Sequence, residues 1–240
     1  MMYIDAKNLT YTEINNILRS SDDSFVIKNC LGHRFLAAGL GKKTVTIEGI
    51  PGNALGAYLS GARIEVLGNA QDAVGDTMNC GEIIIHGNIG DTAGYAMRGG
   101  EFYVEKNAGY RTGIHMKAYR EKKPVIVIGG HTGSFLGEYQ AGGLIIVLGI
   151  YDDGRPLVGN FPSMGMHGGK MFLRGDTSDI CFSERTIVRK ATAEDIAEIK
   201  PYLEKYCRYF DKKTEDILNE EFTVVTPDSK NPYKQMYIAN

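Results

Sequence analysis

Three carboxylates in glycine-rich stretches are the side chains of this 240-residue sequence that best suit acid–base chemistry. Asp72, Asp76 and Asp91 have Arg98 and Arg111 close by in the sequence. Paired carboxylates can protonate a leaving group and activate water at a glycosidic bond, so these acids fit a hydrolase or lyase. The chain has no tryptophan to stack on a sugar ring. We therefore expect a solvated loop edge, and keep the enzyme as an alternative.

The cysteines and histidines favour neither zinc nor an iron–sulfur cluster. The cysteines lack C-x-x-C spacing, which predicts buried reduced thiols: Cys30, Cys80, Cys181 and Cys207. The histidines lack H-x-H and H-x-x-x-H spacing: His33, His86, His115, His131 and His167. Stacked repeats could still bring distant histidines together, so a histidine ligand site stays open here.

Two glycine runs invite comparison with nucleotide-binding loops. Neither Gly39-Leu-Gly41 nor Gly165-Met-His-Gly-Gly169-Lys170 has the spacing of such a loop or its place between a strand and a long helix. No serine lies in a G-x-S-x-G motif. From the residues we therefore predict no catalytic, cofactor-binding or metal-binding residue in this chain.

A repeat organises the middle of the sequence. Gly49–Leu67, Gly68–His86 and Gly87–Glu105 each span 19 residues, and longer segments follow. Each repeat ends in two apolar residues that would share one face of a strand. The first of each pair forms one column: Val45, Ile64, Ile83, Phe102, Val125, Ile145 and Met171. The second forms another: Ile47, Val66, Ile85, Val104, Val127, Val147 and Leu173. A period near 20 residues indicates a solenoid.

Glycines recur within the repeats and predict corners, because glycine adopts positive φ without strain. Gly56, Gly75, Gly94 and Gly137 share one position in the repeat. A second inward column is apolar: Leu59, Met78, Met97 and Met166. These columns predict an all-β fold, a single-stranded parallel β-helix of about seven coils. A left-handed hexapeptide repeat does not fit, since nineteen is not a multiple of six.

The strand residues between the two inward columns would point outward. They turn from polar to apolar along the stack: Thr46, Glu65, Ile84, Tyr103, Ile126, Ile146 and Phe172. An apolar outer face must be covered. We expect the chain's own C-terminal helix to cover it, and a partner subunit is the alternative.

We divide the chain into a helical cap over 1–24, β-helix repeats over 25–175 and a helical tail over 176–240. The cap has a capping box at Thr10 and Glu13. The tail predicts a helix over 193–210 that Pro201 kinks or splits, a short helix over 214–219 and a strand over 222–225. The last dozen residues suggest an extended segment.

The composition limits the function classes. The formal net charge is −2, so the chain has no bulk attraction to nucleic acid or to anionic lipid. No run approaches 18 apolar residues, and the first residues do not form a secretory signal. We therefore expect a cytoplasmic protein with no nucleic-acid and no membrane partner.

The repeats resemble those of the C-terminal, GXGXG-type β-helix domain of the glutamate synthase large subunit. The resemblance is carried by 52–76, by Tyr139-Gln-Ala-Gly-Gly-Leu-Ile-Ile-Val-Leu-Gly149, by Met166-His-Gly-Gly-Lys-Met-Phe-Leu173 and by the tail segments 193–210 and 222–227. It implies a right-handed β-helix without chemistry of its own. It also implies a function as a structural or assembly subunit of a split glutamate synthase.

In that role the chain would brace a glutamine amidotransferase against an FMN-binding synthase subunit. FMN and the iron–sulfur cluster would be held by these partner chains, and none by this one. The sequence lacks a cysteine at position 2, a cysteine cluster and an α/β-barrel pattern. The repeats are similar also to the C subunit of formylmethanofuran dehydrogenase, so a complex of that type is the first alternative. A stand-alone hydrolase or lyase that uses a groove along the coils is the second. An oligomer fits either reading.

Overall fold

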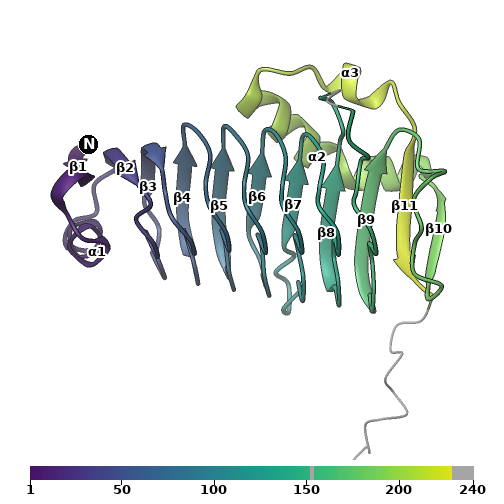
Figure 1. Ribbon diagram of the computed structural model, residues 1–240, viewed down its shortest axis with the longest axis horizontal. Helices are drawn as coiled ribbons and strands as arrows, with labels where there is room; N and C mark the ends of the chain where they lie inside the picture. The colour runs from purple at the N-terminus through teal and green to yellow at the C-terminus, as the bar shows by residue number, and fades with distance from the viewer. Residues whose placement is uncertain (152–153, 229–240) are drawn as a thin grey trace, which may run out of the picture.

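One stack of parallel strands forms the body of the protein. The computed structural model describes residues 1–151 and 154–228, and within them one sheet contains eleven strands. Nine of them are parallel and follow chain order (Figure 1): β1 (Met2–Asp5), β2 (Phe25–Leu31), β3 (Thr44–Ile50), β4 (Ser60–Val66), β5 (Cys80–Ile85), β6 (Glu101–Val104), β7 (Val125–Ile128), β8 (Ala141–Val147) and β9 (Gly168–Arg174). Each connection places the next strand beside the last. The predicted all-β parallel β-helix is therefore confirmed.

Two antiparallel strands close the C-terminal end of the sheet. β11 (Phe222–Pro227) pairs with β9, and β10 (Thr186–Lys190) pairs with β11. The strand predicted over 222–225 is confirmed. Three strands were not predicted: β2, which lies before the first regular repeat, and also β1 and β10, because β1 has four residues and four of the five residues of β10 are exposed. Neither β1 nor β10 has the alternation that marks a half-buried strand.

Residues one repeat apart lie side by side in the sheet. Val45 pairs with Ile64, Ile64 with Ile83, and Ile83 with Phe102. All four side chains are fully buried. The predicted inward columns are therefore confirmed from β3 to β6.

The predicted columns are wrong by one residue at β7. Phe102 pairs with Ile126, whereas Val125 and Val127 belong to the outer face. All four residues of β7 are buried, so apolar character does not distinguish the two faces. The doublet Gly129-Gly130 hides the repeat boundary, and a slip of one residue moves every side chain to the other face. The outward column accordingly contains Val127 in place of Ile126.

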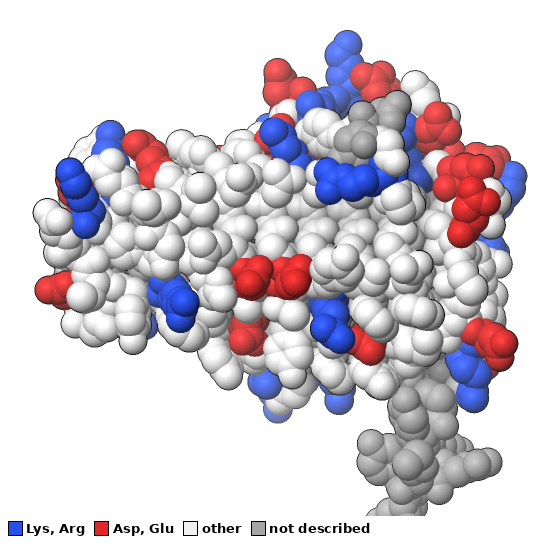
Figure 2. Space-filling view, viewed as in Figure 1, with Lys and Arg blue, Asp and Glu red and all other residues white. Residues whose placement is uncertain are grey.

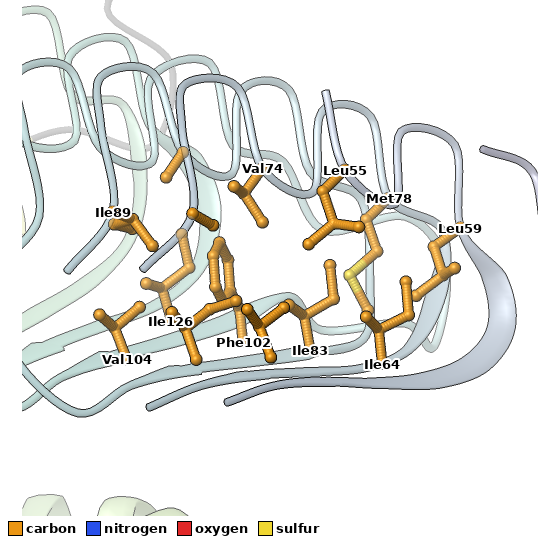
Figure 3. Packing of buried hydrophobic residues seen from close by; sticks show 14 of the residues in the cluster. Leu55, Leu59, Ile64, Val74, Met78, Ile83, Ile89, Phe102, Val104 and Ile126 are labelled. Carbon is orange, nitrogen blue, oxygen red and sulfur yellow. The ribbon is translucent and has the colours of Figure 1, made fainter. Parts of the chain in front are cut away.

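The interior of the coil lies between the strands and the chain segments that face them. Leu55 and Val74 point from these segments toward Ile64, Ile83 and Phe102 on the strands (Figure 3). All five are fully buried. Side chains therefore fill the inside of the coil, as in a packed protein interior.

The second inward column has one residue in each coil, beginning with the first coil. It comprises Leu40, Leu59, Met78, Met97, Met116, Gln140 and Met166, all buried. Gln140 is its one polar member. The predicted column had four of these positions and lacked Leu40, Met116 and Gln140. Gln140 follows the aligned Gly137 by three positions, but its polar side chain does not fit an apolar column.

Helix α2 (Ala193–Phe210) covers the outer face of the C-terminal half of the sheet (Figure 1). Ile199, Leu203 and Phe210 pack in one buried cluster with outward strand residues such as Ile146 and Phe172. The expected covering by the chain's own helix is therefore confirmed. Helix α3 (Thr214–Leu218) follows and adds Ile217 to the same cluster.

Pro201 does not split α2, which corrects the predicted split, while the kink at Pro201 stays a prediction. The helix runs without interruption from Ala193 to Phe210. Pro201 is exposed, so water can bond the carbonyl of Ala197 that receives no N–H from proline.

The N-terminal end of the stack is covered by helix α1 (Tyr11–Ser20), which follows the short helix η1 (Ala6–Asn8) (Figure 1). The predicted capping box is present, since Thr10 and Glu13 bond each other's backbone N–H groups. The boundaries at 24 and 175 stay a prediction. The final extended segment lies outside the described residues.

Candidate functional site

Each coil turns opposite the sheet through a corner segment of the same conformation. Seven such segments occur in the described chain: 34–39, 53–58, 72–77, 91–96, 110–115, 134–139 and 160–165. Alternate residues have positive φ, as at Ala54 (62°), Gly56 (64°) and Tyr58 (57°). A residue with a Cβ is strained by roughly 1 kcal/mol or more in this region.

Hydrogen bonds between coils offset that strain. The N–H of Gly56 donates to the carbonyl of Leu36 in the preceding coil at 2.8 Å. The N–H groups of Ala54 and Tyr58 donate to the carbonyls of Asp72 and Asp76 in the following coil, at 2.9 and 2.7 Å. The corner backbone is thus tied in both directions, which makes the corners a rigid frame for the side chains they carry.

The central glycines of the corners also leave room for the interior. A Cβ on Gly94 would lie 2.4 Å from Cδ1 of Ile126, and one on Gly113 would lie 2.6 Å from Cδ1 of Ile145. The predicted glycine corners are therefore confirmed. They serve both the backbone conformation and the packing beneath it.

The outward side chains of the seven corner segments form what we call the corner face. It is rich in exposed large apolar and aromatic residues: Phe35, Tyr58, Tyr95, Tyr110, Tyr139, Phe161 and Met164. The sequence analysis missed these residues. A signal was available, because Tyr58 and Tyr139 each follow a corner glycine by two positions.

Asp72 and Asp91 belong to the corner face and act as backbone acceptors. Oδ1 of Asp72 accepts the N–H of Asp91 at 2.9 Å, and Oδ1 of Asp91 accepts that of Tyr110 at 2.8 Å. Asp76 accepts the hydroxyl of Thr77 at 2.7 Å. Asp72 and Asp91 are exposed and Asp76 is half-buried. The geometry accounts for Asp72 and Asp91 as parts of the coil-to-coil framework, whereas the carboxylate of Asp76 is bonded within its own coil.

An asparagine ladder on another edge makes the same kind of bond. Oδ1 of Asn69 accepts the N–H of Asn88 at 2.8 Å, Oδ1 of Asn88 accepts that of Asn107 at 3.2 Å, and Oδ1 of Asn107 accepts that of His131 at 2.8 Å. An amide oxygen can therefore replace a carboxylate in this role.

The five histidines have separate surroundings. His86 lies 2.9 Å from Glu65, His115 stacks on Tyr139, His131 contacts the carbonyls of Tyr151 and Pro156, and His167 contacts that of Gly165. Among residues 1–151 and 154–228, no group of three or more His, Cys, Asp or Glu side chains is placed to hold a metal ion.

Cys30 and His33 form a thiol–imidazole contact that sequence spacing did not suggest. Sγ of Cys30 lies 3.7 Å from Nδ1 of His33, whose Nε2 is 3.1 Å from the carbonyl of Leu9. Burial raises the pKa of Cys30 to about 11, so the thiol is protonated at neutral pH. Only 2% of the residue is exposed. This pair is therefore unsuited to act as a nucleophile and base.

A polar network holds α2 on the sheet. The hydroxyl of Tyr209 donates to Glu82 at 2.7 Å, and that of Tyr206 to the carbonyl of Glu105 at 2.9 Å. Lys205 pairs with Glu101 at 2.6 Å. The helix is thus fixed by directed bonds as well as by its apolar side.

Asp195, at the start of α2, is bonded by Arg189, Thr192 and Lys170. The bond from the Arg189 guanidinium is the main reason that the pKa of Asp195 lies far below its usual range, against the opposing effect of burial. Asp195 joins α2 both to β10 and, through Lys170, to β9.

The sequence pattern of the GXGXG motif family matches residues 4–228. This chain belongs to the GXGXG motif family. The chain is also similar to uncharacterized protein MJ1350 of Methanocaldococcus jannaschii, with 48% identity over 248 residues that cover 98% of this chain and 95% of that protein.

A solved structure shares the fold of this GXGXG chain. It is a chain of the formyltransferase/hydrolase complex FhcABCD from Methylorubrum extorquens, determined in complex with methylofuran. The match has a TM-score of 0.65 and 19% identity, and it covers 95% of this chain and 91% of the other. In the described part of the GXGXG chain, no helix combines the length and apolar character needed to cross a membrane.

Proposed function

We propose that this chain is the structural or assembly subunit of a split glutamate synthase. It braces a glutamine amidotransferase chain against an FMN-binding synthase chain. The observation that carries the proposal is the match of the GXGXG pattern to residues 4–228, in a fold whose interior is filled by side chains. The tail segments that resemble the glutamate synthase domain pack on the sheet as α2 and β11.

On this proposal the chain contributes shape and rigidity. FMN and the iron–sulfur cluster are bound by the partner chains, and this chain has no catalytic, cofactor-binding or metal-binding residue. It acts in the cytoplasm, with protein partners and with neither nucleic acid nor membrane. The buried Cys30–His33 pair and the backbone-bonded Asp72 and Asp91 support the proposal, because each has a structural role.

Co-purification tests the proposal. Expressed with the amidotransferase and synthase chains of its own organism, this chain should elute with them as one complex. Alone, it should show no flavin absorbance and should not consume glutamine. A native extract from which a tagged chain returns only itself would contradict the proposal, as would stoichiometric FMN on the isolated chain.

A formylmethanofuran dehydrogenase-type complex is the second candidate. It is favoured by the fold shared with a chain of the formyltransferase/hydrolase complex. The identity of the partners separates the two candidates, since the β-helix has the same supporting role in both. A stand-alone hydrolase or lyase would instead require turnover by the isolated chain.

A further inference from the structure

The corner face is long enough and apolar enough to be an interface. Its seven segments are stacked about 4.8 Å apart, which gives a length of about 30 Å. A standard protein interface of about 800 Å² per partner has similar dimensions. Tyr58 is 58% exposed, and Tyr110 and Phe161 are each 54% exposed. Tyrosine, phenylalanine, methionine and arginine are the residues enriched at such interfaces.

Neighbouring coils hold these side chains in place. The ring of His115 stacks on Tyr139 at 5.1 Å and meets Tyr95 edge-on at 5.8 Å. Phe135 stacks on Phe161 at 5.4 Å. Rings that are already ordered lose little conformational entropy when a partner binds, so this row is preorganised for contact.

In the C-terminal half of the corner face, one cation lies among the aromatic rings and is paired with an acid. Arg111 lies over the ring of Phe135 at 5.1 Å and reaches Glu138 at 3.6 Å. This half of the face is therefore close to neutral. Figure 2 shows one side of the molecule, on which a few acidic and basic side chains lie among uncharged ones over the middle of the stack.

The N-terminal half of the corner face has an unbalanced negative charge. Asp72, Asp76 and Asp91 form no ion pair with any side chain among residues 1–151 and 154–228. The seven corner segments contain two cations, Arg111 and Arg34, and Arg34 lies in the first segment, 34–39. In this half the three carboxylates therefore outnumber the one cation, Arg34, and they lie beside exposed tyrosines.

We propose that the corner face docks a partner subunit whose contact strip presents Lys or Arg to Asp72, Asp76 and Asp91 and apolar side chains to Tyr139 and Phe161. This inference rests on the proposed function, since the partner is one of the chains that this subunit braces. Charge complementarity selects the partner and its register, while the aromatic half supplies the buried contact. The outer face of the C-terminal half of the sheet is already occupied by α2, which leaves the opposite wall of the coil for this role.

Two sets of variants test the two halves of the face. The double variant Asp72→Asn with Asp91→Asn removes charge but keeps the backbone acceptors, as the asparagine ladder shows. The double variant Tyr139→Asn with Phe161→Asn removes the rings at two residues of positive φ, a region that asparagine tolerates. The matched controls are Glu204→Gln with Glu215→Gln for charge, and Tyr3→Asn with Tyr119→Asn for exposed rings.

Biolayer interferometry measures the binding of each variant to the preassembled amidotransferase–synthase pair. The melting temperature of each variant shows whether it is folded. The aromatic variant should raise Kd at least tenfold. The charge variant should lower the association rate and flatten its dependence on salt. Both control variants should stay within twofold of wild type.

The results separate this inference from the proposed function. Wild-type binding that both corner variants retain within twofold would overturn the corner face as the docking site and leave the proposed function standing. Failure of the wild-type chain to bind the pair would contradict the proposed function and this occupant together. Self-association of the isolated chain that is lost in the Tyr139→Asn, Phe161→Asn variant would show a second copy on the face and overturn the assignment.

Discussion

Oδ1 of Asn15 accepts the backbone N–H of Ala37 at 2.8 Å. In later coils the equivalent N–H, as at Gly56 and Gly75, donates to a backbone carbonyl of the preceding coil. The first corner has no preceding coil, and the side chain of Asn15 takes the place of that carbonyl. Its Nδ2 also donates to the carbonyl of Phe35 at 2.8 Å. Helix α1 therefore ends the stack by continuing its hydrogen bonding, which is what a solenoid cap must do.

Replacement of Asn15 by alanine should lower the free energy of unfolding by about 1–3 kcal/mol, because the buried N–H of Ala37 loses its acceptor. Chemical denaturation measures the change. The exposed neighbour Asn16 provides the control, since Asn16→Ala removes the same atoms from the same helix. Equal effects of the two substitutions would show that the bond to Ala37 does not contribute.

Replacement of Gly94 by alanine should destabilise the protein by more than replacement of Gly32. Both glycines have positive φ, 68° and 71°, so both variants suffer the backbone strain. Only at Gly94 would the new Cβ meet a side chain, Cδ1 of Ile126 at 2.4 Å, whereas nothing lies within 4 Å at Gly32. The difference in unfolding free energy should be about 1–3 kcal/mol.

Adding Ile126→Val to Gly94→Ala should recover part of that loss, because valine lacks the Cδ1 atom in question. If Gly94→Ala and Gly32→Ala have the same melting temperature, the packing beneath the corner is not as described. The same holds if Ile126→Val lowers the stability of the Gly94→Ala variant by as much as it lowers that of the wild type.

Replacement of Gln140 by methionine should stabilise the protein by about 1 kcal/mol. Gln140 is fully buried, and its Oε1 has no hydrogen-bond partner among residues 1–151 and 154–228. Its Nε2 makes only long bonds, 3.2, 3.3 and 3.5 Å to the carbonyls of Gly143, Gly142 and Lys170. A buried acceptor without a partner costs about 1–3 kcal/mol, and methionine already occupies this position in the adjacent coils.

The measurement is the melting temperature of Gln140→Met, with Gln140→Glu as the comparison that adds a buried charge. A fall in stability for the methionine variant would indicate that the amide has a structural partner or a role that outweighs its burial.

The pH dependence of stability should report on Asp195. Its pKa in the folded protein is below the ordinary value of about 3.9, so the ionised carboxylate adds stability above that pH. That contribution is lost as the pH falls through the lowered pKa. Asp195→Asn should therefore cost about 2 kcal/mol at pH 7, and the difference from wild type should shrink below about pH 4. A difference that is constant between pH 7 and pH 3 would show that the charge of Asp195 is not responsible.

The columns at β3–β6 could be predicted from the sequence because three successive repeats of 19 residues fix their register. The outward residues Thr46 and Glu65 on β3 and β4 are also polar, although Ile84 and Tyr103 on β5 and β6 are buried. At β7 both faces are buried, and the same reasoning assigned Val125 to the face that Ile126 occupies. Counting back from Gly130, the second glycine of the doublet, would have placed Ile126 and Ile128 in the inward columns, where the structure has them. The split expected at Pro201 was wrong, because proline's effect depends on whether water reaches the unpaired carbonyl.

The candidate site was harder to foresee than the fold. Asp72 and Asp91 were recognised as an edge, but their bonds to backbone N–H groups depend on the stacking of coils. The corner aromatics become a continuous face only when residues 20 to 26 positions apart, such as His115 and Tyr95 or Phe135 and Phe161, come into contact. The replacement of a missing coil by Asn15 likewise becomes evident only from the folded chain.

The central claim is that this chain supports other subunits and has no reaction of its own. Glutamate formation from glutamine and 2-oxoglutarate should be assayed with the amidotransferase and synthase chains, with and without this chain, and with this chain alone. We expect the two partners to couple glutamine hydrolysis to glutamate formation efficiently only when this chain is added, and this chain alone to be inactive. Turnover by the isolated chain, or partner activity that its addition leaves unchanged, would contradict the account.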